Sequence, residues 1–113
     1  MKFHAIRFRE QDKNSFDAIR SGEKRIETRA ATEKYTVIEA GDMIVFECAR
    51  ETFSKTVVVR YLWKTVEAMV KEVPLKKVIP WVETVEEAKA VYASFPGYEE
   101  KIKQFGIVGF DLE

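Results

Sequence analysis

A run of β-branched residues, Val57-Val58-Val59, makes residues 55–62 the clearest β-strand of this chain. Branched side chains favour a pleated, half-buried backbone. Other short segments alternate apolar and polar residues as strands do, and turn residues separate them. A small closed or half-closed barrel suits strands of this length. The six predicted strands span residues 1–8, 25–30, 35–38, 43–48, 55–62 and 105–112, with a hairpin loop at 50–54.

Strand alternation puts Val57, Val59 and Tyr61 on one face, and Ile44 with Phe46 on another. We expect at least one of these sets to meet Phe110 and the helix face that carries Val91 and Tyr92.

Three other segments carry apolar residues at the three- and four-residue spacing of an α-helix. Helix-start and helix-stop residues bound each of them. Strands gather in the middle and at both ends of the chain, with helices between them, so the pattern predicts an α+β fold with three flanking helices. The predicted helices run from Asp12 to Gly22, from Val66 to the residue before Pro74, and from the Thr84/Glu87 capping box to Pro96-Gly97.

The composition fits a single domain over residues 1–113, because a chain of this length supports one hydrophobic core. Apolar residues make up 46% of the chain, and charged residues make up 34%, against about 25% in average proteins. Lys and Arg balance Asp and Glu at 19 each, and the pI is about 6.6. This balance excludes a strongly basic nucleic-acid coat, so any contact with nucleic acid must use a local patch.

The single cysteine, Cys48, excludes an internal disulfide and is typical of a reducing compartment. With His4 as the only histidine, a structural zinc site is not expected. The N-terminus has no signal-peptide pattern, and no segment approaches the ~20 apolar residues of a membrane helix. We therefore expect a cytoplasmic protein with no metal, no cofactor and no membrane partner. The oligomeric state stays open.

The segment 22–29, Gly-Glu-Lys-Arg-Ile-Glu-Thr-Arg, places the cations Lys24 and Arg29 and the carboxylate of Glu27 shortly after a helix-stop glycine. Strand alternation puts Glu27 and Arg29 on one face. The turn at Gly22 lets Lys24 approach Glu27. Trp81 follows Pro80 in an irregular segment, where an exposed aromatic side chain could stack on a base. We predict that Gly22, Lys24, Glu27, Arg29 and Trp81 form a ligand-binding site.

Three motifs lie in order along the chain: GxKxxExR at residues 22–29, GDxIxF at 41–46, and FPG at 95–97 followed by a last strand that contains Phe110. Together they resemble the ASCH domain family of the PUA-like superfamily. The resemblance covers most of the chain. It implies a PUA-like β-barrel, a cleft lined by the GxKxxExR residues, and an association with RNA or nucleotides.

The chain resembles more distantly the bacterial acetylcytidine amidohydrolases. That resemblance implies a catalytic role for Lys24 as base, with a threonine nucleophile three positions later and a glutamate proton donor for which Glu83 is the nearest candidate. Glu27 occupies the threonine position here, and attack by a carboxylate on an amide would give a mixed anhydride. We expect Thr28 to face away from the cleft, and Glu27 to hold the proton on Lys24.

These observations favour a polar binding site over an amide-cleaving one. The leading hypothesis is a cleft that binds RNA or a nucleotide-like small molecule. In it, Lys24 and Arg29 supply charge and donors, and Glu27 accepts from a base edge or orients Arg29. An amidohydrolase acting on an acetylated nucleoside, with Lys24 and Glu27 as catalytic residues, is the alternative. A protein-interaction adaptor without a small ligand is the third.

Overall fold

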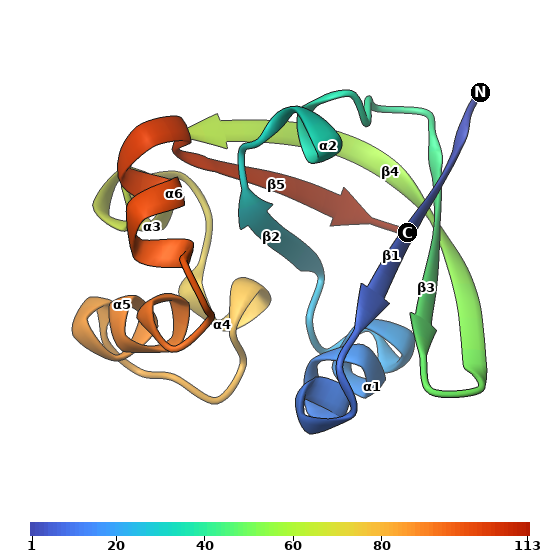
Figure 1. Ribbon diagram of the computed structural model, residues 1–113, viewed down its shortest axis with the longest axis horizontal. Coiled ribbons are helices and arrows are strands. Elements are labelled where there is room, and N and C mark those ends of the chain that lie inside the picture. The colour runs from blue at the N-terminus through green and yellow to red at the C-terminus, as the bar shows by residue number, and fades with distance from the viewer.

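A computed structural model describes residues 1–113 as an α+β fold built on one curled, half-barrel sheet (Figure 1). The strand order is β1-β3-β4-β5-β2, so β1 and β2 are the two free edges. Only the pairing of β1 with β3 is parallel. The strands are β1 Phe3–Phe8, β2 Ile26–Ala30, β3 Met43–Cys48, β4 Glu51–Trp63 and β5 Ile107–Leu112.

The helices fall into two groups. The first closes one end of the half-barrel near the β3–β4 hairpin, and the second gathers beyond β2, away from β1 (Figure 1). The first group is the 3-10 turn η1 Glu10–Asp12 and α1 Lys13–Ser21. The single helical turn α2 Glu33–Thr36 belongs to neither group. The second group is α3 Val66–Glu72, α4 Leu75–Val78, α5 Val85–Ala93 and α6 Tyr98–Phe105. None of the helices combines the length and hydropathy needed to span a bilayer.

The sheet buries a separate core on each of its faces. Val108, Phe110 and Leu112 of β5 point into the half-barrel, where they meet Phe46 and other members of the first core. Ile107 points to the opposite face and packs with the helices of the second core. Alternation along one strand therefore serves both cores. Gly109 is required on the second face, because a Cβ there would lie 2.6 Å from the Trp63 ring.

The predicted meeting of Ile44 and Phe46 with Phe110 is confirmed, since all three belong to the first core. Val57, Val59 and Tyr61 do not share one buried face as expected. A bulge between Val57 and Val59 shifts the register, so Val57 is buried while Val59 lies on the surface. The helix face that carries Val91 and Tyr92, expected to join Phe110, packs in the second core instead.

Two local predictions were wrong. Residues 35–38 do not form a strand, because Tyr35 and Thr36 bond back to the Thr32 carbonyl in a helical turn that packs Tyr35 and Ile38 on the first core. The sheet therefore has five strands. The hairpin loop is only Ala49-Arg50, and β4 begins at Glu51, opposite Cys48. Phe53, assigned to the loop, stacks on Phe46 with ring centroids 5.2 Å apart.

Local start and stop signals of the helices agree with the structure. The Thr84/Glu87 capping box is present, and α3 ends before Pro74. The structure adds α4 and α6, which were not predicted. Gly97, expected only as a stop signal, adopts φ 75° and is also the residue from which α6 begins.

Candidate ligand-binding site

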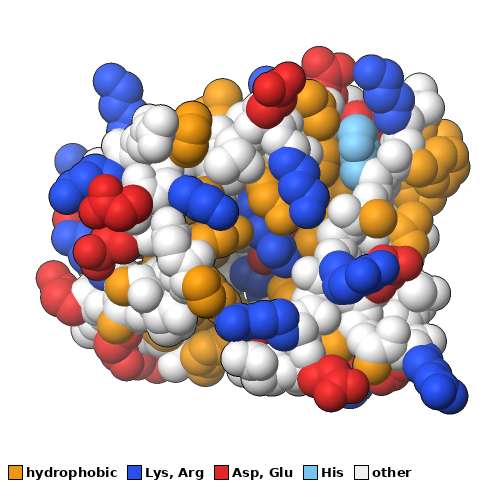
Figure 2. All heavy atoms as spheres, in the orientation of Figure 1, with side chains coloured by type: hydrophobic (Ala, Val, Ile, Leu, Met, Phe, Trp, Pro, Cys, Tyr) orange, Lys and Arg blue, Asp and Glu red, His pale blue; other side chains and the backbone are white.

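A cavity of about 270 Å³ opens between the half-barrel and the second helix group. Figure 2 shows this face hollowed near its centre, with Lys and Arg side chains around the hollow. The end of β1, the free edge of β2, and the segment from Ile79 to Tyr98 surround it. The lining residues are Arg7, Phe8, Arg9, Asp12, Ser15, Lys24, Glu27, Thr28, Arg29, Ile79, Trp81, Val91, Tyr92, Phe95, Pro96 and Tyr98.

Lys24 lies buried at the floor of this cavity. Its Nζ donates to the carbonyl oxygens of Ile26, at 3.1 Å, and Val78, and lies 3.4 Å from Glu27 Oε1. Three acceptors match the three N–H bonds of an ammonium group. Lys24 therefore links β2 to α4, and its donors are occupied by the protein itself.

Glu27 uses both of its carboxylate oxygens within the site. Oε1 accepts the Thr28 backbone N–H at 3.0 Å and faces Lys24, while Oε2 accepts from Arg29. This leaves Glu27 no open position for a base edge, so of the two predicted roles the geometry favours orientation of Arg29.

The free edge of β2 explains why Lys24 and Glu27 turn inward. The Arg25 carbonyl accepts the Leu112 N–H of β5, and the Ala31 N–H donates to the Gly106 carbonyl just before β5. The intervening Ile26 carbonyl and Thr28 N–H therefore point to the opposite edge. Lys24 binds that carbonyl, and Glu27 accepts that N–H. The two side chains thus hydrogen-bond backbone groups on the unpaired edge of β2, which would otherwise offer a template for pairing with another strand.

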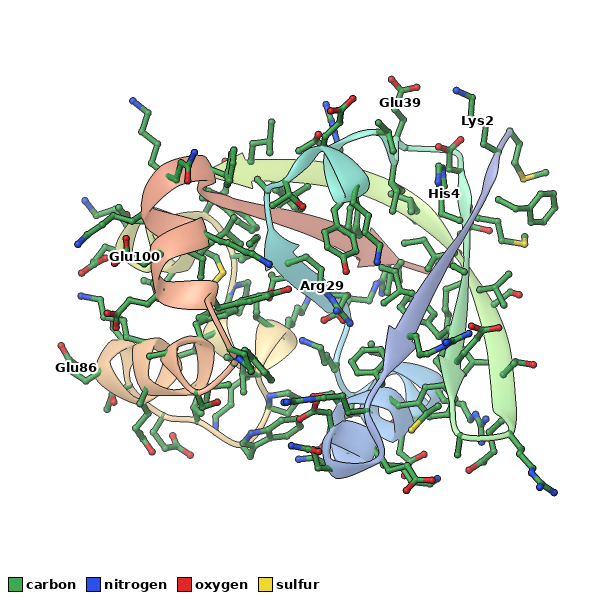
Figure 3. The ribbon with its side chains drawn as sticks, viewed as in Figure 1. Lys2, His4, Arg29, Glu39, Glu86 and Glu100 are labelled. Carbon is green, nitrogen blue, oxygen red and sulfur yellow. The ribbon has the colours of Figure 1, made fainter.

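Arg29 is the most exposed of Lys24, Glu27 and Arg29. Figure 3 shows Arg29 beside β2, on the side that faces β1. Its Nε and Nη2 donate to Glu27 Oε2 at 3.3 and 3.1 Å. Its guanidinium carbon lies 4.8 Å from the Phe8 ring centroid and 5.5 Å from that of Tyr35. Nη1 has no partner within the protein. A guanidinium held by a carboxylate and two rings is a preorganised donor for a ligand.

The electrostatics of the cluster differ from the sequence-based expectation. Burial lowers the pKa of Lys24, while Glu27 opposes that shift and Arg29 adds to it. The expectation gave most weight to the carboxylate, because the sequence did not show that Lys24 is buried and that removing its ammonium from water is costly. Burial also disfavours the charge on Arg29, yet Glu27 and nearby tyrosines offset it and raise the pKa of Arg29.

Thr28 does not face away from the cavity as expected. The cavity lies at the edge of β2 rather than on one face, so Thr28 lines it together with Glu27 and Arg29. Its Oγ1 lies 2.6 Å from the Tyr92 hydroxyl. Burial raises the pKa of Tyr92 despite that hydrogen bond, so the pair is neutral and polar.

The other predicted residues divide between the cavity and its surroundings. Trp81 lines the cavity and is 44% exposed, which places it at the rim. Gly22 does not line it; with φ 90°, Gly22 ends α1 and turns the chain toward Lys24. Glu83 also lies outside the lining, and its carboxylate bonds Lys76 at 2.6 Å on the surface.

Most of the aromatic wall was not predicted from the sequence. Phe8 comes from β1, whereas Tyr92, Phe95 and Tyr98 come from α5, the turn after it and the start of α6, and the two sides meet only in the folded chain. The FPG motif at 95–97 was the one available signal, because Phe95 and Pro96 line the cavity. Arg7 and Arg9 carried no signal beyond their charge.

His4 lies away from the cavity lining. Its Nε2 is 2.9 Å from Asp42 Oδ2. Asp42 also accepts the backbone N–H groups of Lys2 and Glu39, so it fastens the start of β1 to the turn before β3. Backbone and His4 hydrogen bonds lower the pKa of Asp42 to about 2. The chain contains no group of three or more side chains placed to hold a metal ion.

The comparisons with known proteins agree with this fold. The ASCH domain model matches residues 12–111, and the chain belongs to the ASCH domain family. A crystal structure of the hypothetical protein PH0355 shares 27% identity with a TM-score of 0.80, over 100% of this chain and 98% of that one. A solution NMR structure of protein PF0455 from Pyrococcus furiosus shares 29% identity with a TM-score of 0.75, over 100% and 96%. No curated protein matches the chain.

Proposed function

We propose that this ASCH domain binds a nucleotide-like ligand in the cavity, either one unpaired nucleotide of an RNA or a free nucleotide. The observation that carries the proposal is the convergence of the Arg29 guanidinium with an aromatic wall. Arginine recognises phosphate and base acceptors, and aromatic rings stack on any base. Nucleotides combine both chemistries in one molecule.

The size of the cavity supports one nucleotide rather than several. At about 270 Å³, it lies just below the ~300–1,000 Å³ of pockets for drug-sized ligands. The net charge of zero argues against a long basic track. We therefore expect a shallow dependence of affinity on salt, as for a protein that contacts only a few phosphates.

Each predicted residue has a role in this proposal. Arg29 donates to the ligand, Glu27 holds Arg29 in place, and Lys24 contributes positive charge to the floor. Trp81 stacks on the ligand at the rim. Gly22 acts indirectly by directing the chain from α1 to Lys24. An open cavity supports a small ligand over the adaptor hypothesis, in which this space would be filled.

Calorimetric titration tests the proposal with two probes: a pool of random, 5′-phosphorylated six-nucleotide RNA, and a set of nucleoside monophosphates. We expect at least one probe to bind and Arg29→Gln to weaken binding about tenfold or more, the usual loss of a charge-assisted bond. Arg25→Gln is the matched control, because Arg25 bonds Asp111 outside the cavity. No binding by either probe, or equal losses in both variants, would refute the proposal.

One observation keeps the amidohydrolase alternative as a second candidate. Thr28 lines the same cavity as Lys24. Burial lowers the pKa of Lys24, which favours the neutral amine that a general base requires. Against it, the Lys24 amine is occupied by two carbonyls and Glu27. We expect no acetate release from acetylated cytidine by the wild type. Release that depends on both Lys24 and Thr28 would make this candidate the better one.

A further inference from the structure

The charged floor of the cavity carries an excess of positive charge. With Lys24 protonated, Lys24, Glu27 and Arg29 form one contact network of two cations and one carboxylate. Burial lowers the pKa of Lys24, so an anion beside the network would favour its protonated form. Their side chains are only 5%, 5% and 16% exposed. A buried charge without a counterion is unfavourable, and no other acidic side chain lines the floor, since Asp12 bonds Arg9 at the rim. An anion inside the cavity would restore the balance.

The hydrogen-bonding groups of the floor also favour an anion over a base edge. Both Glu27 oxygens and the Lys24 amine have partners within the protein. The open group is Arg29 Nη1, which can only donate. The floor therefore offers a charged donor and no free carboxylate acceptor, which suits phosphate oxygens better than the donor-bearing edge of a base.

The order of residues from floor to mouth gives the ligand a direction. Lys24, Glu27 and Ile79 at the floor are buried, whereas Trp81 and Arg7 at the mouth are exposed. A phosphate at the floor leaves the base near Trp81 and the outer part of the aromatic wall. A base at the floor would instead place a neutral ring against the uncompensated charge.

Resting on the function proposed above, we infer that the cavity binds a terminal phosphomonoester, with the phosphate inward on Arg29 and the base outward beside Trp81. An internal phosphodiester carries chain on both sides and cannot enter a cavity of this size end-on. The recognised group is thus the phosphorylated end of an RNA or the phosphate of a free mononucleotide. A phosphomonoester also carries more negative charge than a phosphodiester, which matches the excess on the floor.

The test compares ends of otherwise identical probes by calorimetry: hexauridylate with a 5′-phosphate, with a 3′-phosphate, and with neither, alongside uridine monophosphate and uridine. We expect one phosphorylated end to bind at least about tenfold more tightly than the unphosphorylated hexamer. If only uridine monophosphate shows this gain over uridine, the source is a free nucleotide. Inorganic phosphate should compete with the bound probe.

Variants separate the floor from the rest of the site. Arg29→Gln should remove the advantage of the phosphate, Arg29→Lys should retain part of it, and Arg25→Gln should leave it unchanged. In the wild type, phosphate binding should raise the pKa of Lys24, measured by NMR of its side chain. Equal affinity of phosphorylated and unphosphorylated probes would overturn this inference while leaving the proposed function intact. Failure of every probe to bind would refute both.

Discussion

Two clusters in this molecule have the same composition and opposite surroundings. In each, a glutamate bridges a lysine and an arginine. Lys24, Glu27 and Arg29 do so in the cavity, and Lys13, Glu51 and Arg20 do so on the surface between α1 and β4. The arginines also share a setting, because Arg29 lies over the rings of Phe8 and Tyr35, and Arg20 lies over the rings of Phe16 and Phe53.

Burial is the difference, and it reverses the electrostatics. The surface side chains are 42–44% exposed, against 5–16% in the cavity. The hydrogen bond to Glu51 raises the pKa of Lys13, whereas burial lowers the pKa of Lys24 despite Glu27. The surface cluster is solvated and satisfied. In the cavity cluster, burial perturbs the pKa of Lys24 in a low-dielectric site, a condition that often accompanies function.

The largest expected difference is in stability after loss of the carboxylate. Glu27→Gln leaves two buried cations without their shared partner, which should lower the free energy of unfolding by about 3–5 kcal/mol. Glu51→Gln is the matched control and should leave the unfolding midpoint nearly unchanged, because its partners stay in water. Urea unfolding monitored by circular dichroism measures both. Similar losses in the two variants would show that burial does not separate the clusters.

A smaller effect is expected in the dependence of stability on alkaline pH. The lowered folded-state pKa of Lys24 means that the unfolded chain binds more protons between that pKa and the ordinary value of 10.5. The contribution of Lys24 to stability should therefore rise with pH in that window, by at most about 1.4 kcal/mol per pH unit. Lys13, with a raised pKa, contributes stability below 10.5 that is lost above it.

Lys24→Met and Lys13→Met isolate these two contributions. Subtracting the unfolding free energy of each variant from that of the wild type, between pH 7 and 10, should give a rising difference for Lys24 and a flat one for Lys13. Tyrosines of the unfolded chain begin to ionise as the pH approaches about 10, but they do so in the wild type and in both variants, so their contribution cancels in the difference. A difference for Lys24 that falls with pH would contradict the burial of its charge.

The smallest effect is expected in the response of each pair to salt. Raising the salt concentration from 0.1 M to 1 M shortens the Debye length from about 10 Å to about 3 Å, and this screening acts mainly on exposed charges. Double-mutant cycles should show the coupling of Lys13 with Glu51 fading over this range. The coupling of Glu27 with Arg29 should persist. If it faded equally, water would have to reach the cavity floor freely.

Local signals account for the parts of the fold that were predicted correctly. The burial alternation of β1, the Thr84/Glu87 capping box and the end of α3 before Pro74 each depend on residues close in the chain. The errors arose where distant contacts decide. Residues 35–38 became a helical turn because that conformation packs Tyr35 and Ile38 on the first core, and the bulge in β4 moved Val59 to the surface.

The sequence also determined the proximity of Lys24, Glu27 and Arg29, because a helix-stop glycine and strand alternation act over a few residues. Only the tertiary structure decided that this cluster is buried, that Thr28 reaches the same cavity, and that Phe8, Phe95 and Tyr98 form its wall. The surface cluster of Lys13, Glu51 and Arg20 uses the same residue types, so composition could not distinguish the two. Burial depends on which segments pack together, and that is a property of the whole fold.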